Sequence, residues 1–371
     1  MKFIKISAFA IVLLLLMQIV SKAFIAIDSS DIENIYGFYA EPENSLDMVM
    51  IGPSEVYTGY APALAWEEYG LKSCNLSIGA VPCNMYKSTV TEIVKRQKPK
   101  LLVINASAFS QGNWNLTDEV YLRKWIDNIP MSQNKLDTVK TIPKNINKDD
   151  EKVKDNISDT LYFPLEKYHG NWKDPEAVYT SFVTRAYMRL SGGGYLKGFY
   201  SKTGITGGRD NLANIGQPTK EAYVLTDECR AYLKELLSYC NKLGIEHVLL
   251  LQPPHETQAA DKSGLEQIES ITKEYGYDFL DLSTDYESSV GIDDSHDFAD
   301  FEHLNAYGAQ KLSSYIGDMA VNQYGIKSDT AKSELSRWKK SVKRTKKALK
   351  MAREYTDRGE AQVVGEYEAA K

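Results

Sequence analysis

The sequence predicts a doubly wound α/β domain, and two observations carry this prediction. Short apolar segments alternate with helical segments in the order strand, helix, strand, which is typical of a parallel sheet with helices between its strands. One of these strands, PKLLVINAS at 99–107, is apolar along almost its whole length. Such a strand is expected where helices cover both faces of the sheet.

Five strands are expected, and each is short and followed by turn residues or a helix: 46–52, 72–80, 99–107, 246–254 and 277–283. Helices are expected between and after them at 61–70, 85–97, 226–245 and 264–276. A last helix follows the stretch DFADFEHLN at 297–305, and its apolar stripe consists of Leu312, Tyr315, Ile316 and Met319.

The alternation breaks between about 110 and 215. Tryptophan-rich stretches, a Lys/Asp-rich stretch and the glycine cluster SGGGYLKGFYSKTGITGG at 191–208 replace it. We predict a mostly helical and loop insertion here, inside an α/β domain that spans residues 45–325.

The N-terminus predicts export from the cytoplasm. Lys2 and Lys5 precede a long apolar run, which orients the segment with its N-terminus inside and the rest of the chain outside. Two interpretations remain open: residues 1–27 form an uncleaved single-pass membrane anchor, or the segment is a signal peptide cleaved near Ala23 and the protein is secreted. A polar linker is expected at 28–44.

The C-terminal tail, 326–371, is strongly basic. Its apolar residues recur at near-helical spacing and predict an amphipathic helix: Leu335, Trp338, Val342 and Leu349. The helix either docks by this narrow apolar edge with its lysines in solvent, or it contacts an anionic envelope polymer or lipid headgroups.

Composition limits the function classes. The 371 residues are 43% hydrophobic and 25% charged, as in an ordinary folded protein, and the net charge of −6 argues against general binding of nucleic acid. Cys74 and Cys83 are close enough in sequence to form a small disulfide loop. Cys229 and Cys240 lie roughly 16 Å apart along one predicted helix, so we expect buried thiols there.

Polar residues follow several of the predicted strands at the point where each ends. Ser54 comes after the first strand, Gly79 after the second, and Asn105 at the end of the third; Asp300 and His303 follow the last. Because ligands gather at the carboxyl ends of parallel strands, we expect these five residues to converge on one rim.

These residue types fit acyl-transfer chemistry. A serine hydroxyl becomes nucleophilic when an imidazole accepts its proton, and a carboxylate three residues before the histidine can hold the ring in the required orientation. Attack on an ester creates an oxyanion, which the amides of Ser54 and Gly79 and the side chain of Asn105 can stabilise. The sequence therefore predicts Ser54, His303 and Asp300 as a catalytic triad.

Four motifs resemble, in order, the sequence blocks of the SGNH (GDSL-like) hydrolase superfamily: IGPSE, SIGA, INAS and DFEHLNAYGAQKL. The resemblance implies a three-layer sandwich around a parallel, flavodoxin-like sheet, with Ser54 as nucleophile, His303 as base and Asp300 as its acidic partner. The first block reads Gly-Pro-Ser where the family has Gly-Asp-Ser, and the third offers only Asn105 in place of Gly-x-Asn-Asp.

The chain looks most similar to exported, membrane-anchored members related to teichoic-acid D-alanyl transfer and polysaccharide O-acetyl transfer. This resemblance implies an envelope polysaccharide or teichoic-acid-like polymer as partner, and a membrane-bound O-acyltransferase as a possible acyl donor. No cofactor, metal or nucleic acid is expected. The alternatives are a simple carbohydrate esterase and a non-catalytic polymer-binding protein on the same fold.

Three further residues are candidates for substrate contact. His255, in QPPHE after a strand, is expected near the same rim, whereas His169 and Trp172 in the insertion either stack on a sugar or simply pack. A metal site is the less favoured interpretation of the acidic loop, where solvated carboxylates are the commoner outcome: Asp293, Asp294, His296 and Asp297.

Overall fold

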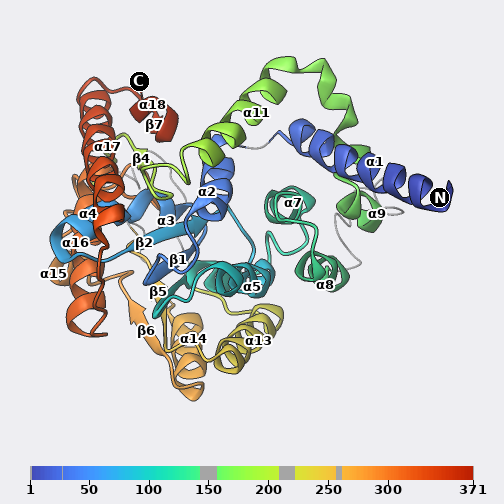
Figure 1. Ribbon diagram of the computed structural model, residues 1–371. Helices are drawn as coiled ribbons and strands as arrows, with labels where there is room; N and C mark the ends of the chain where they lie inside the picture. The colour runs from blue at the N-terminus through green and yellow to red at the C-terminus, as the bar shows by residue number, and fades with distance from the viewer. Residues whose placement is uncertain (1, 27, 143–156, 209–221, 256–260, 371) are drawn as a thin grey trace.

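The centre of the molecule is a five-stranded parallel sheet in the order β2-β1-β3-β5-β6 (Figure 1). The computed structural model describes residues 2–26, 28–142, 157–208, 222–255 and 261–370. The strands are β1 (Met48–Gly52), β2 (Ser73–Ser77), β3 (Leu101–Asn105), β5 (His247–Gln252) and β6 (Asp278–Asp281). With β4 in a separate small sheet, this is the 2-1-3-4-5 order of flavodoxin-like folds. The five predicted strands and the α/β class are confirmed.

Alternate residues of each strand enter different cores, which makes three layers. Val49 and Ile51 of β1 pack into one cluster, and Met48 and Met50 pack into another on the opposite face. The first cluster contains residues of α2 (Ser29–Ala40), α5 (Tyr86–Arg96), α13 (Asp227–Leu243) and α14 (Ser263–Glu274). The second contains residues of α3 (Ser54–Gly59), α4 (Pro62–Tyr69), α15 (Tyr286–Ser289) and α16 (Ala306–Asn322).

The sheet register brings the ends of the first three strands to one edge. Gly52 pairs with Ser77, and Ile51 pairs with Ile104, so Asn105 lies opposite Gly52. The segments that follow β1, β2 and β3 therefore start next to one another, as the sequence predicted.

The predicted polar linker is wrong, because residues 29–40 form a packed helix. In α2, Ile32, Ile35 and Phe38 are at most 2% exposed and belong to the core beside β2. Asp31 and Glu33 on the same helix are also buried. The buried carboxylates gave the segment the composition of a linker, although it completes one layer of the fold.

The insertion is mostly helical where the structure describes it, which confirms the prediction. It contains α6 (Ser107–Ser110), α7 (Glu119–Ile126), α8 (Gln133–Thr141), α9 (Ile157–Tyr162), α10 (Pro164–Tyr168) and α11 (Pro175–Leu190), with a 3₁₀ turn at His169–Lys173 and another, before the insertion, at Cys83–Met85. Residues 143–156 and 209–215 of the predicted insertion lie outside the described residues.

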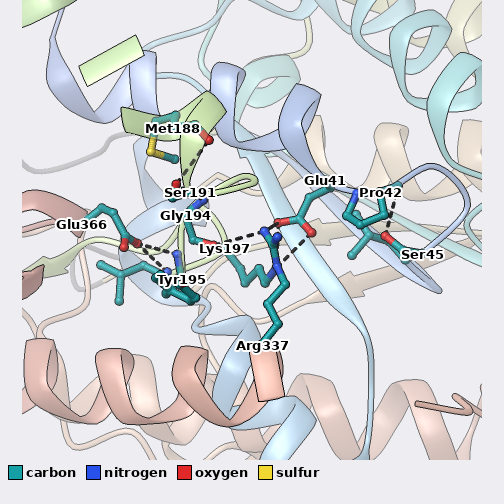
Figure 2. Close-up of polar contacts among 12 residues, drawn as sticks. Glu41, Pro42, Ser45, Met188, Ser191, Gly194, Tyr195, Lys197, Arg337 and Glu366 are labelled. Carbon is teal, nitrogen blue, oxygen red and sulfur yellow. Dashed lines mark hydrogen bonds and ion pairs between the residues drawn. The ribbon is translucent and has the colours of Figure 1, made fainter. Parts of the chain in front are cut away.

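After α11 the chain is anchored by two buried carboxylates (Figure 2). The amides of Tyr195 and Leu196 donate to Glu366 at 2.8 and 2.7 Å, and the ammonium of Lys197 donates to Glu41 at 2.7 and 2.9 Å. Arg337 also reaches Glu41, at 3.2 Å. These contacts fix the path of the chain into β4 (Ser201–Lys202), which pairs antiparallel with β7 (Val363–Val364).

The basic tail forms the predicted helix, α17 (Lys332–Asp357), which lies beside α4 and α16 in Figure 1. Trp338 stacks on Trp66 with ring centroids 5.6 Å apart, and Val342 and Leu349 are buried. Docking by the apolar edge is therefore confirmed. The sequence did not predict β7 or α18 (Glu366–Ala370), which bring the end of the chain back to β4.

The N-terminal segment is the helix α1 (Lys2–Phe24), which extends away from the sheet and packs beside α10 and α11 (Figure 1). Several of its apolar side chains are exposed, Ile4 by 73% and Phe9 by 69%. Among the residues that the structure describes, no helix combines the length and hydrophobicity needed to cross a bilayer, so the predicted membrane anchor is not supported.

The four cysteines are buried and free. The disulfide considered for Cys74 and Cys83 is absent, since Cys83 Sγ instead faces Cys229 Sγ at 3.7 Å. Cys74 lies within β2, where burial raises the pKa of its thiol well above the ordinary range. The expectation that Cys229 and Cys240 are buried thiols is confirmed.

Candidate active site

Ser54 is the first residue of α3, directly after the turn that ends β1. Pro53 occupies the N-cap, and the amide of Ser54 belongs to the first turn of the helix, where N–H groups have no helical acceptor. The turn is tight because β1 and β3 approach closely: a Cβ at Gly52 would lie 2.4 Å from Cβ of Asn105. Only glycine fits there, and it brings the serine to the strand edge.

The structure brings Ser54, His303 and Asp300 together. Nε2 of His303 lies 2.8 Å from Oγ of Ser54, and Nδ1 lies 2.8 Å from Oδ1 of Asp300 and 3.0 Å from Oδ2. The hydrogen bond between Ser54 and His303 connects residues 249 positions apart in the chain. A neutral imidazole with its proton on Nδ1 would donate to Asp300 and accept the proton of Ser54.

The backbone before α16 holds Asp300 and His303 in this arrangement. Oδ1 of Asp300 accepts from the amides of Glu302 at 3.0 Å and His303 at 2.9 Å, which closes an Asx-type turn. Asn305 caps α16 by accepting from two amides of its first turn. The acid, the base and the helix cap are thus parts of one turn, which explains their close spacing in the sequence.

The neighbours of Asp300 favour its ionised form. Its partial burial alone would raise its pKa, but the hydrogen bond and charge of His303, followed by the charge and hydrogen bond of Lys202, outweigh burial and hold the pKa of Asp300 far below its ordinary value. The carboxylate therefore stays available to orient His303.

The amide of Gly79 is already engaged. It donates to Oδ1 of the buried Asp31 at 2.7 Å, and Lys124 pairs with the same carboxylate at 2.9 Å. An oxyanion could use this amide only by displacing Asp31, so the structure does not support the predicted role of Gly79. The sequence does not indicate this contact, because the composition of residues 28–44 predicts a polar linker there.

The side chain of Asn105 is buried at the end of β3. Its Oδ1 accepts from the amide of Ser107 at 2.7 Å, which leaves Nδ2 directed elsewhere. This Nδ2 is buried and has no hydrogen-bond partner among the described residues. A buried amide N–H without a partner is costly, and such groups occur where a ligand supplies the acceptor. Asn105 remains the better oxyanion candidate beside the amide of Ser54.

Ser54 and His303 open into a cavity of about 740 Å³. Its walls come from five parts of the chain: α2, α3, the insertion, the loop before α16 and the C-terminal tail. Besides Ser54 and His303 it is lined by tyrosines and by charged side chains that the sequence did not indicate: Tyr57, Tyr179, Tyr187, Tyr200, Tyr367, Asp28, Glu33, Lys202 and Glu368. No spacing in the sequence connects these segments, so only the folded chain reveals them.

Glu33 and Tyr200 form a buried pair in this wall. The hydroxyl of Tyr200 donates to Glu33, and the amide of Glu366 donates to the same carboxyl oxygen at 3.1 Å. Burial outweighs these hydrogen bonds and raises the pKa of Glu33 to about 8. At neutral pH most of this carboxyl is therefore protonated.

None of the three predicted substrate contacts lines the cavity. His255 is 2% exposed and faces Glu302, 3.9 Å away, so it contacts the loop of the triad and does not line the cavity. Nδ1 of His169 donates to the carbonyl of Glu166 at 2.7 Å, and Trp172 is 65% exposed. Neither insertion residue belongs to the cavity lining, so the structure gives the sugar-stacking prediction no support.

The acidic loop is held together by its own hydrogen bonds. The buried Asp297 pairs with Lys311 at 2.6 Å and with the ring of His296 at 3.0 Å, and Asp293 accepts from Ser295. Within the described part of the chain, no group of three or more His, Cys, Asp or Glu side chains has an arrangement that would hold a metal ion.

No protein-family model matches the chain, and no curated protein matches it at a significant level. Fold and side-chain geometry are therefore the basis for assigning a function.

Proposed function

We propose that this protein is an exported serine acyltransferase or esterase of the SGNH type, held at the membrane, that moves an acetyl- or D-alanyl-type group on a cell-envelope polysaccharide. The observation that carries the proposal is the series of hydrogen bonds from Ser54 through His303 to Asp300 at one wall of a large cavity. Three residue types in this order and geometry are the arrangement that activates a serine hydroxyl.

In the proposed first step, Oγ of Ser54 attacks the acyl carbon while Nε2 of His303 takes the hydroxyl proton. The oxyanion is stabilised by the amide of Ser54 and Nδ2 of Asn105. As the tetrahedral intermediate collapses, His303 gives the proton to the leaving alcohol, and the acyl group remains as an ester on Ser54. In the second step, a sugar hydroxyl or water attacks this ester, His303 removes its proton, and Ser54 is regenerated.

The cavity supports a polymer segment as the acceptor. Its volume of about 740 Å³ lies within the range of sites for small ligands, and tyrosines from three elements contribute ring faces and hydroxyls to it. An envelope polysaccharide or a teichoic-acid-like polymer is the proposed partner, and a membrane-bound O-acyltransferase is the proposed acyl donor. The exposed apolar side chains of α1, such as Ile4 and Phe9, support a position at the membrane.

A simple carbohydrate esterase is the second candidate. The side chains of His303 and Asp300 are 14% and 33% exposed, so water can reach the site without any conformational change. Hydrolysis of a small soluble ester by the purified protein alone would favour this candidate over transfer.

The experiment is labelling of the protein with a serine-directed fluorophosphonate, followed by mass spectrometry of its peptides. We expect one adduct, on Ser54, which both Ser54→Ala and His303→Ala abolish. Ser77→Ala is the control, because Ser77 ends the neighbouring strand β2 but makes no hydrogen bond to His303. A folded wild-type protein that stays unlabelled would contradict the proposal and favour a polymer-binding protein.

A further inference from the structure

A lysine from a different part of the chain touches the triad. Lys202 is the last residue of β4, which is in bridge contact with Asn305 and pairs with β7 of the C-terminal tail. Its Nζ donates to Oδ2 of Asp300 and lies 3.1 Å from Nδ1 of His303. The ammonium thus adjoins the two triad members that control the charge of the imidazole.

The ammonium and the ring compete for the same carboxylate. Oδ1 of Asp300 accepts from Nδ1 of His303, while Oδ2 accepts from Lys202. When Nδ1 carries the proton that it donates to Asp300, it has no lone pair to accept from Lys202. The 3.1 Å approach of Nζ is then a contact between an ammonium and an N–H group, which becomes repulsive once the ring is positively charged.

Other charged groups around His303 do not cancel this effect. On its own loop are Asp300, which Lys202 partly neutralises, and Glu302, which pairs with His255. From the other elements that line the cavity, the acidic side chains are Asp28, Glu33 and Glu368, and the remaining titratable side chains are tyrosines: Tyr57, Tyr179, Tyr187, Tyr200 and Tyr367. Asp28 pairs with Lys124, Glu33 is mostly protonated at neutral pH, and Glu368 accepts from the amide of Gly365.

We propose that Lys202 is a positioning residue of this site: it holds the partly exposed Asp300 against His303 and keeps the imidazole neutral, and so able to accept the Ser54 proton, in more acidic solution. The inference rests on the proposed function, because it assumes that His303 acts as the base for Ser54. It adds Lys202 of β4 to the residues that form the site. Because β4 pairs with β7, the C-terminal tail then helps to position these residues.

The test is the pH dependence of fluorophosphonate labelling at Ser54 in the full chain. In Lys202→Met we expect the acidic limb of the rate profile to move to higher pH by about one unit, because the imidazolium loses a repulsive neighbour and keeps Asp300 to itself. Lys202→Arg keeps the charge and should leave the limb within about 0.3 unit of wild type. Lys202→Gln, which keeps a hydrogen-bond donor without charge, should behave like Lys202→Met.

The matched control is Lys262→Met. Lys262 pairs with Asp281 at 3.2 Å, and the two side chains are 32% and 27% exposed, close to the 28% and 33% of Lys202 and Asp300. Lys262 does not line the cavity, so the acidic limb of the Lys262→Met rate profile should coincide with that of wild type.

The possible failures are distinguishable. An unmoved limb in folded Lys202→Met and Lys202→Gln would overturn the inference and leave the triad intact. Loss of folding in both neutral variants, with Lys202→Arg folded, would make Lys202 a structural residue and would also overturn it. Absence of labelling in wild type at any pH would defeat the proposed function itself.

Discussion

At the scale of a single residue, a substitution of Asn105 can test its proposed role as oxyanion donor separately from its role in packing. We expect Asn105→Asp to slow labelling or ester turnover at Ser54 by at least about a hundredfold, because the substitution removes the Nδ2 donor and puts a negative charge where the oxyanion forms. The new carboxylate can still accept from the amide of Ser107, as the amide oxygen does now, so the local turn should persist. Steady-state rates with a small soluble ester, together with thermal unfolding, measure both effects.

The control for this substitution is Asn115→Asp. Asn115 is also buried, and its Nδ2 donates to the carbonyl of Ala80 at 3.0 Å, but it does not adjoin Ser54. Equal losses of activity in the two variants would show that any buried aspartate disturbs the fold, and would remove Asn105 from the oxyanion site.

At the scale of elements, the buried ion pair between Glu41 and Lys197 holds the segment that leads to β4 (Figure 2). We expect Glu41→Gln to lower the free energy of unfolding by roughly 3 kcal/mol, because it leaves the buried Lys197 and its neighbour Arg337 without their carboxylate. Combining it with Lys197→Met should recover part of this loss, since the double variant buries one fewer unpaired charge. Chemical denaturation of the four proteins in this cycle measures the coupling.

A double variant that is less stable than the sum of the single ones would contradict the role of this pair. The prediction also concerns the site, because Lys202 lies five residues beyond Lys197 and β4 has only two residues. If Glu41→Gln loosens this segment, Lys202→Met should shift the pH profile of labelling less in the Glu41→Gln background than in wild type.

Strands β1 and β3 were predictable because their apolar runs are continuous and end at Gly52 and Asn105, which makes their signal local. The pairing of Asp300 with His303 was predictable for the same reason, because both residues and the cap of α16 form one turn. The cavity wall was not predictable. Lys202 contacts Asp300 across 98 positions, and Glu366 caps the amide of Leu196 across 170 positions, and no periodicity connects such pairs.

The prediction of a polar linker at 28–44 was wrong for a different reason. Buried carboxylates such as Asp31 and Glu33 have the composition of solvent-exposed residues, and their burial is possible only because Gly79, Lys124 and Tyr200 supply partners from elsewhere. Sequence reasoning that assigns acids to the surface therefore misplaces α2, and with it the partner that occupies the Gly79 amide.

At the scale of the whole molecule, Glu33 couples stability to pH. The pKa of this carboxyl is about 8 in the folded protein against an ordinary 4.5. Folding therefore favours the protonated form: the stabilisation is complete below about pH 4.5 and is lost as the pH rises through 8. Over this range we expect Glu33 to reduce the free energy of unfolding by roughly 3–5 kcal/mol.

Glu33→Gln tests this expectation, because the amide is neutral at every pH and can still accept from Tyr200. Its free energy of unfolding should fall less than that of wild type between pH 5 and pH 9, measured by urea denaturation. Parallel curves for the two proteins would mean that Glu33 is ionised in the folded state, and the cavity would then carry one more negative charge than described above.

The central claim is that Ser54 forms a covalent ester during the reaction. The most direct measurement is the mass of the peptide containing Ser54 after brief reaction with p-nitrophenyl acetate and quenching in acid. The account predicts that this peptide gains the mass of one acetyl group, and that Ser54→Ala gains none and releases no p-nitrophenol above the uncatalysed rate. Undiminished turnover by Ser54→Ala, or an acetyl group found only on other residues, would contradict it.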